Sequence, residues 1–94
     1  MSSDSQLVHA AQKGEPEAFG EIVERYKQSI FGVALLKLRD HHDAEDVAQL
    51  TFVEAYQRIG DLRDNQRLGS WLRSIAHNRA VDRIRERLRE QVTI

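Results

Sequence analysis

The sequence contains no cysteine, so disulfide bonds and thiolate metal sites are excluded. Proline occurs once and glycine five times among the 94 residues, which leaves long segments of helix-forming residues uninterrupted. No apolar run approaches the roughly 20 residues that a membrane span needs, so we expect no membrane insertion. The first ten residues, MSSDSQLVHA, lack the basic start and the apolar stretch of a signal peptide. These absences favour a single intracellular domain.

The charges are nearly balanced overall but unevenly distributed along the chain. The 14 basic and 15 acidic residues give a formal net charge of −1, which argues against an autonomous, avid DNA-binding protein. Residues 1–46 contain five basic and nine acidic side chains, whereas residues 47–94 contain nine basic and six acidic ones. Such a division indicates two surfaces with different partners, although chance scatter of charges gives the same pattern.

Apolar residues recur at steps of three and four along most of the chain, which predicts an all-α fold, a compact bundle of about four helices. The expected helices span residues 4–13, 16–38, 43–59 and 69–90. Pro16 is expected to open the second helix and Asp43 to cap the third. The polar segment GDLRDNQRLG, residues 60–69, is expected to be a loop. We expect one domain over residues 1–94, with the start of a linker near residues 90–94.

The last predicted helix carries different patterns on its two halves. In its first half, one apolar side predicts core packing by Leu68, Trp71, Leu72, Ile75 and Ala76. In its second half, a stripe turned roughly half-way around the helix predicts other neighbours for Val81, Ile84 and Leu88. A third row of residues along this helix fits either a network of hydrogen-bonded polar groups or a binding face. Its members are Trp71, Asn78, Asp82, Arg85 and Arg89.

The segment DAEDVAQLTFVEAYQRI, residues 43–59, is followed after a polar loop by WLRSIAHNRAVDRIR, residues 71–85. In this order and at this separation, the two motifs resemble the second conserved region of bacterial RNA polymerase sigma factors, most closely of the extracytoplasmic-function (ECF) type. The upstream segment KGEPEAFGEIVERY, residues 13–26, resembles the start of the same family. The resemblance covers nearly the whole chain and implies a bacterial, cytoplasmic transcription initiation factor.

The sequence departs from the family pattern at several positions. Leu50 stands where glutamate is usual, and Glu15 replaces a common aspartate. Arg73 and Ser74 stand where an aromatic and a basic residue are frequent. The loop before Trp71 carries no aromatic residue, so base selection is expected to rest on polar contacts. ECF factors normally continue into a helix-turn-helix domain, so we expect either an excised domain or a protein that lost its second half.

The resemblance implies that the third helix docks on a coiled coil of the polymerase β′ subunit. The residues concerned are Asp43, Glu45, Asp46, Gln49, Leu50 and Val53. The acids would pair with basic polymerase residues, although acids in a first turn are also what any helix prefers. Leu50 and Val53 lie opposite the apolar stripe of their helix, so we expect both to be exposed.

The resemblance also implies that another surface recognises and melts the minus-ten promoter element by capturing the unpaired non-template strand. The residues concerned are Arg63, Asn65, Gln66, Arg67, Trp71, Arg73, His77, Asn78, Arg79, Asp82 and Arg83. Such a surface needs a basic track for phosphates and pockets or platforms for splayed bases. Trp71 shares a side with Leu72 and Ile75, which favours a core position over a stacking platform. Asn78 and Asp82 are four residues apart and can bond to each other instead.

Other functions have weaker support in the sequence. Adjacent His41 and His42 point apart on a helix, and no spacing aligns two ligands, so we expect no metal. No nucleophile–base motif or phosphate loop appears, so we expect neither an enzyme nor a cofactor. The main alternative is a sigma-like domain that binds only protein, either polymerase or an anti-sigma factor. A helix-turn-helix duplex binder is less favoured, because the loop at residues 60–69 is longer than the usual tight turn.

Overall fold

The computed structural model describes residues 2–92 and places most of them in helices. The elements in order are α1 (Asp4–Gln12), α2 (Pro16–Leu38), α3 (His41–Arg58), the short 3₁₀ turns η1 (Ile59–Asp61) and η2 (Asn65–Arg67), and α4 (Leu68–Val92). The predicted all-α bundle of four helices is confirmed, and no strand occurs within residues 2–92. Of the predicted linker, residues 90–92 continue α4, and residues 93–94 lie outside the described residues.

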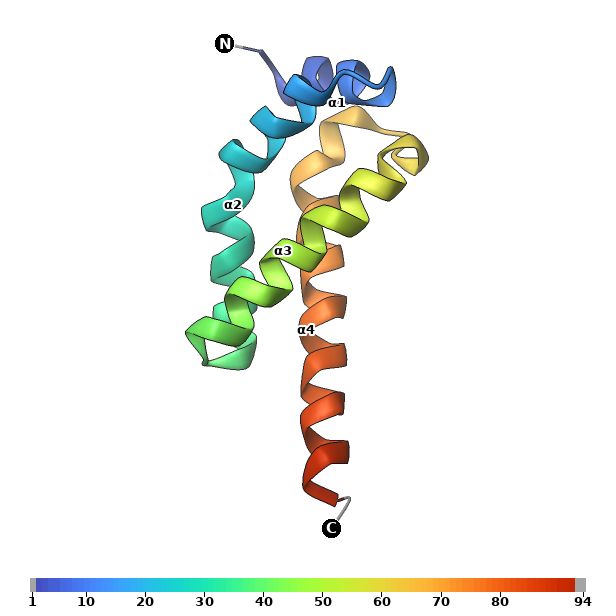
Figure 1. The fold of residues 1–94 in the computed structure, drawn as a ribbon. Coiled ribbons are helices and arrows are strands. Elements are labelled where there is room, and N and C mark those ends of the chain that lie inside the picture. The colour runs from blue at the N-terminus through green and yellow to red at the C-terminus, as the bar shows by residue number, and fades with distance from the viewer. Residues whose placement is uncertain (1, 93–94) are drawn as a thin grey trace.

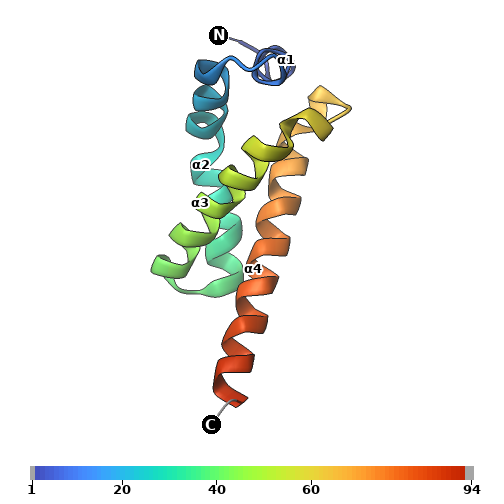
Figure 2. The ribbon, with the colours of Figure 1, turned by 45° about the vertical axis from the view of Figure 1, so that its right-hand side comes forward.

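The helices form an elongated bundle in which α3 packs against both of the longest helices. α3 contacts α2 and α4, and Figure 1 shows it running obliquely across them. α1 lies across one end, and α4 extends beyond the other helices at the opposite end (Figures 1 and 2). The turns η1 and η2 contact α1, so the loop between α3 and α4 lies at the α1 end of the bundle.

Local interactions determine where α1 ends and α2 begins. Ser3 caps α1 by accepting a hydrogen bond from the backbone N–H of Gln6 at 3.2 Å, and the Gln6 side chain accepts from Ser3 in return at 2.9 Å. Gly14 has a φ of 90°, a left-handed conformation that glycine adopts without strain. Pro16 then begins α2 as predicted, at a position where its missing N–H costs nothing.

α3 begins earlier than predicted, because Asp40 caps it and Asp43 does not. The Asp40 carboxylate accepts a hydrogen bond from the backbone N–H of Asp43 at 2.9 Å. The preceding residue, Arg39, ends α2 in a left-handed conformation with a φ of 53°. His41 and His42 therefore lie in the first turn of α3 and do not separate the two helices.

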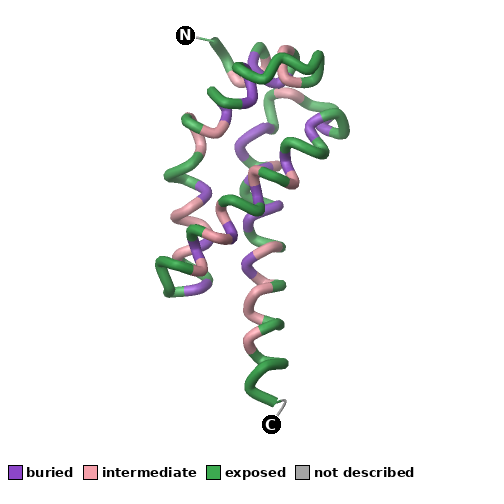
Figure 3. Tube along the Cα trace, in the orientation of Figure 1, coloured by how far each residue is buried: buried purple, intermediate pink, exposed green. Residues whose placement is uncertain are grey.

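The core consists of two apolar clusters along the bundle. The larger cluster lies toward the α1 end and includes the fully buried Ile22, Leu68 and Leu72. The smaller cluster contains Ala34, Leu38, Ala44, Val47 and Ala80. Figure 3 shows the consequence for α4, which is buried along its first turns and exposed along its last ones.

The second apolar stripe predicted for α4 is a packing surface only in part. Ile84 packs against the smaller cluster, as the prediction of different neighbours for the two halves requires. Leu88, one turn further on, is 55% exposed. The C-terminal end of α4 extends beyond the neighbouring helices (Figure 1), which leaves few side chains to cover its last turns.

The side chain of Gln12 fixes the α3–α4 loop to the end of α1. Its Nε2 atom donates hydrogen bonds to the carbonyl oxygens of Ile59 and Leu62, both at 2.9 Å. The Leu62 side chain is itself buried in the larger cluster. The loop is therefore anchored through its backbone and through one side chain, which keeps its polar residues in a defined place.

Replacement of Gly32 by alanine is expected to raise the free energy of unfolding by about 0.5–1 kcal/mol. Gly32 lies inside α2, and apart from its two chain neighbours and the nearby backbone of α2 no described atom lies within 4 Å of the position that its Cβ would occupy. At Gly69 the same Cβ would lie 3.2 Å from the Tyr26 ring, so Gly69→Ala should stabilise less or destabilise. Urea denaturation followed by circular dichroism measures both variants. Equal stabilisation by the two would contradict a tight contact between Tyr26 and Gly69.

Candidate nucleic-acid interface and docking surface

The α3–α4 loop and the first turns of α4 surround a hollow of about 360 Å³, here called the loop hollow. Its lining residues are Asp61, Leu62, Arg63, Asp64, Arg67, Ser70, Trp71 and Ser74. Two local hydrogen bonds hold this backbone in place. The Asp64 carboxylate accepts from the backbone N–H of Gln66 at 3.1 Å, and the Ser70 hydroxyl donates to the carbonyl oxygen of Arg67 at 3.2 Å. The loop hollow therefore presents charged, hydroxyl and indole groups on an ordered loop.

Trp71 belongs both to the core and to the loop hollow. The side chain is half-buried and packs against the larger cluster, in agreement with the predicted core position. The same side chain also lines the loop hollow, where its indole offers a flat apolar surface. One residue thus joins the packing of the bundle to a surface on which a base can stack.

A second hollow of about 450 Å³, here called the helix hollow, lies on the neighbouring side of α4. Its lining residues are Val33, Ser70, Arg73, Ser74, His77 and Asn78. Ser70 and Ser74 line both hollows, so the two are adjacent along one ridge of α4. The lining of the helix hollow contains no carboxylate, and its hydrogen-bond donors include a guanidinium, an amide and the Ser74 hydroxyl.

Tyr26 supports the start of α4, on which both hollows depend. Its hydroxyl donates to the Asp4 carboxylate, which also accepts from Arg25 at 2.9 Å. Burial raises the pKa of Tyr26, and the hydrogen bond to Asp4 raises it further. The Tyr26 ring lies against Gly69, where a Cβ would be only 3.2 Å from its atoms. Side chains of α1 and α2 thus fix the first turn of α4.

The structure brings together six of the eleven residues that were predicted to contact DNA. They line the loop hollow or the helix hollow, and they are Arg63, Arg67, Trp71, Arg73, His77 and Asn78. Asn65 and Gln66 lie in η2, beside the loop hollow but outside its lining. Asp82 lies further along α4 and is 3.8 Å from Arg85.

Arg79 and Arg83 do not share a surface with these residues, which corrects the expectation of one continuous face. Arg79 Nε lies 2.8 Å from the Glu54 carboxylate of α3, and Arg83 Nη1 lies 3.2 Å from the Asp43 carboxylate. Arg87 also pairs with Asp43. These arginines project toward α3 because the side of α4 that carries them is the side on which α3 packs.

The contact of Arg79 with α3 is made by the Glu54 carboxylate. It accepts hydrogen bonds from Arg79 at 2.8 Å and from Arg58 at 2.7 Å. Burial opposes the ionisation of Glu54, but the hydrogen bonds from the two arginines outweigh it, so the pKa of the carboxyl lies below its usual value of 4.5. Glu54 therefore stabilises the folded state in its ionised form.

Replacement of Glu54 by glutamine is expected to lower the free energy of unfolding by about 0.5–1 kcal/mol near pH 7. Because the folded-state pKa is lowered, the contribution of Glu54 is present above its usual pKa of 4.5 and is lost as the pH falls through the folded-state value. The free energies of unfolding of the unmodified chain and of Glu54→Gln should therefore converge in acid. Denaturation curves between pH 3 and 7 measure the difference, and a difference that grows toward pH 3 would contradict the assignment.

The residues predicted to dock on polymerase differ in their surroundings on α3. Leu50 is 39% and Val53 54% exposed, which confirms the predicted exposure, and Gln49 is exposed beside them. Glu45 is exposed and Asp46 half-buried. Asp43 differs, because Arg83 and Arg87 hold it against α4. The outer surface of α3, defined here as Glu45, Asp46, Gln49, Leu50 and Val53, is therefore the candidate docking surface.

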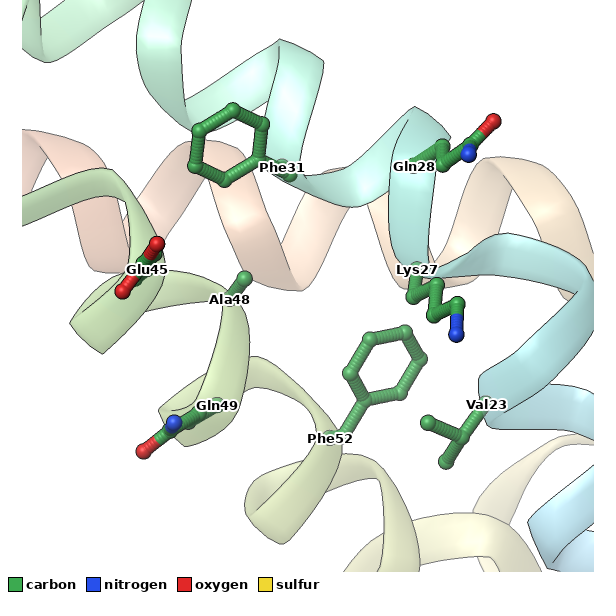
Figure 4. A pocket seen from close by; sticks show the side chains of 8 residues that line it. All are labelled: Val23, Lys27, Gln28, Phe31, Glu45, Ala48, Gln49 and Phe52. Carbon is green, nitrogen blue, oxygen red and sulfur yellow. The ribbon is translucent and has the colours of Figure 1, made fainter. Parts of the chain in front are cut away.

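A groove of about 460 Å³ between α2 and α3 borders this docking surface. Figure 4 shows Phe52 of α3 pointing toward Val23 and Lys27 of α2. The complete lining is Val23, Lys27, Gln28, Phe31, Glu45, Ala48, Gln49 and Phe52. Glu45 and Gln49 belong to both the groove and the docking surface, so an apolar recess continues from the exposed side chains of α3.

Sequence reasoning missed several of these residues for identifiable reasons. Phe31 and Phe52 follow the same apolar spacing as the core, and periodicity does not distinguish a core position from the rim of a groove. Val33 reaches the helix hollow from α2, which no local pattern indicates. Ser70 and Ser74 are four residues apart, and Ser74 is three residues before His77. This spacing places the three residues on one side of a helix and identifies the ridge in retrospect.

Residues 2–92 contain no group of three or more His, Cys, Asp or Glu side chains arranged to hold a metal ion. In the same part of the chain, no helix combines the length and the apolar character needed to cross a membrane.

Comparison with protein families and curated proteins gives consistent matches. The family model for sigma-70 region 2 matches residues 22–90. The ECF RNA polymerase sigma factor SigW of Bacillus subtilis is 38% identical over 80 residues, which are 85% of this chain and 43% of SigW. The RNA polymerase sigma-H factor of Pseudomonas aeruginosa is 36% identical over 84 residues, which are 89% of this chain and 44% of that protein. The chain thus spans less than half the length of these relatives.

A solved structure shares the fold over nearly the whole chain. It is the NMR structure of an engineered region 2 of sigmaE in complex with GTAAAA. The match has a TM-score of 0.88 and 30% sequence identity, and it covers 96% of this chain and 97% of that one.

Proposed function

The chain belongs to the sigma-70 region 2 family, and from this premise we propose that it is the promoter-engaging domain of an ECF-type transcription initiation factor. It captures the unpaired non-template strand of the minus-ten element and docks on the β′ coiled coil of RNA polymerase. It acts on the bacterial cytoplasmic transcription machinery, and its part in strand opening is binding without covalent chemistry.

The observation that carries the DNA proposal is the pair of hollows that meet at Ser70 and Ser74. Melting requires a surface that prefers unpaired bases to paired ones, and such surfaces combine a stacking group with cationic contacts to the backbone. Trp71 supplies the stacking group, Arg63 and Arg67 line the same hollow, and Arg73 lines the adjacent one. The matched engineered region 2 of sigmaE was solved with GTAAAA, which supports the same kind of ligand here.

The roles of the predicted DNA residues differ under this proposal. Those at the hollows, together with Asn65 and Gln66 of η2, contact bases and phosphates. Arg79 and Arg83 connect α4 to α3 through Glu54 and Asp43, so their first role is to set the angle between the helices.

The docking proposal rests on the exposed side chains of α3. Leu50 and Val53 are apolar groups that gain burial when a partner covers them. Glu45 and Asp46 provide negative charge beside them, which suits a basic partner and favours rapid, oriented association. The matched relatives are named as RNA polymerase sigma factors, and this supports polymerase as the partner.

The groove between α2 and α3 favours a second candidate function, binding of protein without promoter activity. Its lining combines Val23, Phe31 and Phe52 with polar groups, which suits an apolar side chain of an anti-sigma factor. Crosslinking to a fork-junction promoter probe in the presence of core polymerase separates the two functions. A promoter-engaging domain crosslinks to the unpaired strand, and a domain that binds only protein does not.

Replacement of Arg63 or Arg67 by alanine is expected to weaken binding of a labelled single-stranded oligonucleotide by about three- to tenfold at low salt. Both side chains are exposed and line the loop hollow, so the loss removes a phosphate or base contact and leaves the core intact. Fluorescence anisotropy at several salt concentrations measures the affinity and its salt dependence.

Lys37→Ala is the matched control, since it removes the same charge at the far end of α2 (Figure 1). It should change the affinity by less than about twofold. Equal losses of affinity on replacement of Lys37 and of the two arginines would mean that the binding rests on general charge attraction. That result would contradict a site at the loop hollow.

A further inference from the structure

Arg73 is the cation of the helix hollow, and no acidic side chain within residues 2–92 forms an ion pair with it. Its side chain is exposed, and the lining of the hollow contains no carboxylate. The charge of Arg73 is therefore not neutralised locally and remains available to an anionic ligand. Four other arginines of α4 differ, because an acid lies within ion-pair distance of each; they are Arg79, Arg83, Arg85 and Arg87.

The guanidinium of Arg73 lies next to the Tyr26 side chain, in space that Gly69 leaves free. A Cβ at Gly69 would be 3.1 Å from Arg73 Nη1 and 3.2 Å from both Cε1 and the hydroxyl oxygen of Tyr26. The two side chains, one from α2 and one from α4, therefore converge on a single point at the first turn of α4. A side chain at position 69 would displace at least one of them.

Tyr26 is itself held in place from α1. Its hydroxyl donates to the Asp4 carboxylate, which also accepts from Arg25 at 2.9 Å. Burial and the hydrogen bond to Asp4 raise the pKa of Tyr26 above its usual value of 10.0, whereas the nearby charge of Arg73 acts in the opposite direction. The phenol is therefore neutral near pH 7 and fixed in direction, so it restricts the guanidinium of Arg73 without neutralising it.

We propose that Tyr26 is a positioning residue for DNA binding, which together with Gly69 holds the Arg73 guanidinium at the helix hollow to bind a phosphate of the captured strand. This inference rests on the proposed capture of single-stranded DNA. An arginine that a neighbour already restricts loses less rotamer freedom when it binds. Ser74 and Asn78 line the same hollow and supply neutral donors for the remaining phosphate oxygens.

Binding of a labelled GTAAAA hexadeoxynucleotide, followed by fluorescence anisotropy at several salt concentrations, tests the proposal. Arg73→Ala should weaken binding about fivefold at low salt and make the affinity less dependent on salt, because one phosphate contact is lost. Tyr26→Leu should weaken binding about threefold, because the guanidinium is no longer restricted. Tyr26→Phe keeps the ring beside Gly69 and should stay within about twofold of the unmodified chain.

A double-mutant cycle separates positioning from a general structural role. When Arg73 is already alanine, Tyr26→Leu should change the affinity by less than about 1.5-fold, because no guanidinium is left to position. Gly69→Ala disturbs the same contact without altering Tyr26, so it should weaken binding by the unmodified chain and not by Arg73→Ala. Circular dichroism at the assay temperature identifies the folded variants, and Gly69→Ala replaces Tyr26→Leu in the cycle if the latter does not fold.

Tyr56→Leu is the matched control, since Tyr56 is 61% exposed on α3 and lines neither hollow. It should leave the affinity within about twofold. Equal losses from Tyr26→Leu with and without Arg73, or no loss from either Tyr26→Leu or Gly69→Ala, overturn the inference. The proposed function then still stands if Arg63→Ala weakens binding. Failure of the unmodified chain to bind the hexamer at low salt overturns both.

Discussion

Replacement of Leu72 by alanine is expected to lower the free energy of unfolding by about 3 kcal/mol. Leu72 is fully buried in the larger cluster, on the face of α4 that also carries Leu68 and Ile75. The substitution removes apolar contacts and leaves a cavity that neighbouring side chains fill incompletely. Domains of this size have a total stability of about 5–15 kcal/mol, so the loss is a large share of it.

Leu88→Ala on the same helix is the control for this prediction. Leu88 is 55% exposed, so its truncation should cost less than about 0.5 kcal/mol. Guanidinium denaturation followed by circular dichroism gives both values. Similar losses at Leu72 and Leu88 would mean that the larger cluster does not dominate the stability of the bundle.

Replacement of Leu50 by aspartate is expected to weaken binding to core RNA polymerase at least about tenfold. Leu50 is an exposed apolar side chain of the proposed docking surface. The substitution removes its burial in the complex and places a charge where the partner excludes water. The melting temperature should change little, because Leu50 lies on the side of α3 away from the core.

Leu36→Asp supplies the same chemical change at a position outside the docking surface. Leu36 is 83% exposed on α2, so neither the fold nor the docking surface requires it. Pull-down or surface plasmon resonance with core polymerase compares the two variants at matched concentrations. Undiminished binding by Leu50→Asp, or equal loss in both variants, would contradict docking through the outer surface of α3.

The helices were predictable from sequence because their signals are local. Apolar spacing located all four helices, and Pro16 marked the start of α2. The start of α3 was misplaced because Asp40 and Asp43 are both suitable caps, and the choice depends on how Arg39 turns the chain at the end of α2. The left-handed backbone conformation of Arg39 does not change the spacing of apolar residues, so that spacing does not reveal it.

The surroundings of a candidate site residue could be predicted only where they depend on which side of its own helix the residue occupies. The exposure of Leu50 and Val53 followed from the stripe opposite them. The contacts of Arg79 with Glu54 and of Arg83 with Asp43 did not, because they depend on which neighbour packs against that side of α4.

The anchoring of the loop by Gln12 affects how this unit should be delimited in the laboratory. The segment that the family model recognises begins at residue 22, so a fragment trimmed to it would lack α1 altogether. Such a fragment would lose the two bonds to Ile59 and Leu62 and the buried Leu7 and Val8. The smallest piece worth expressing therefore starts ahead of Ser3, well upstream of the stretch by which relatives are recognised.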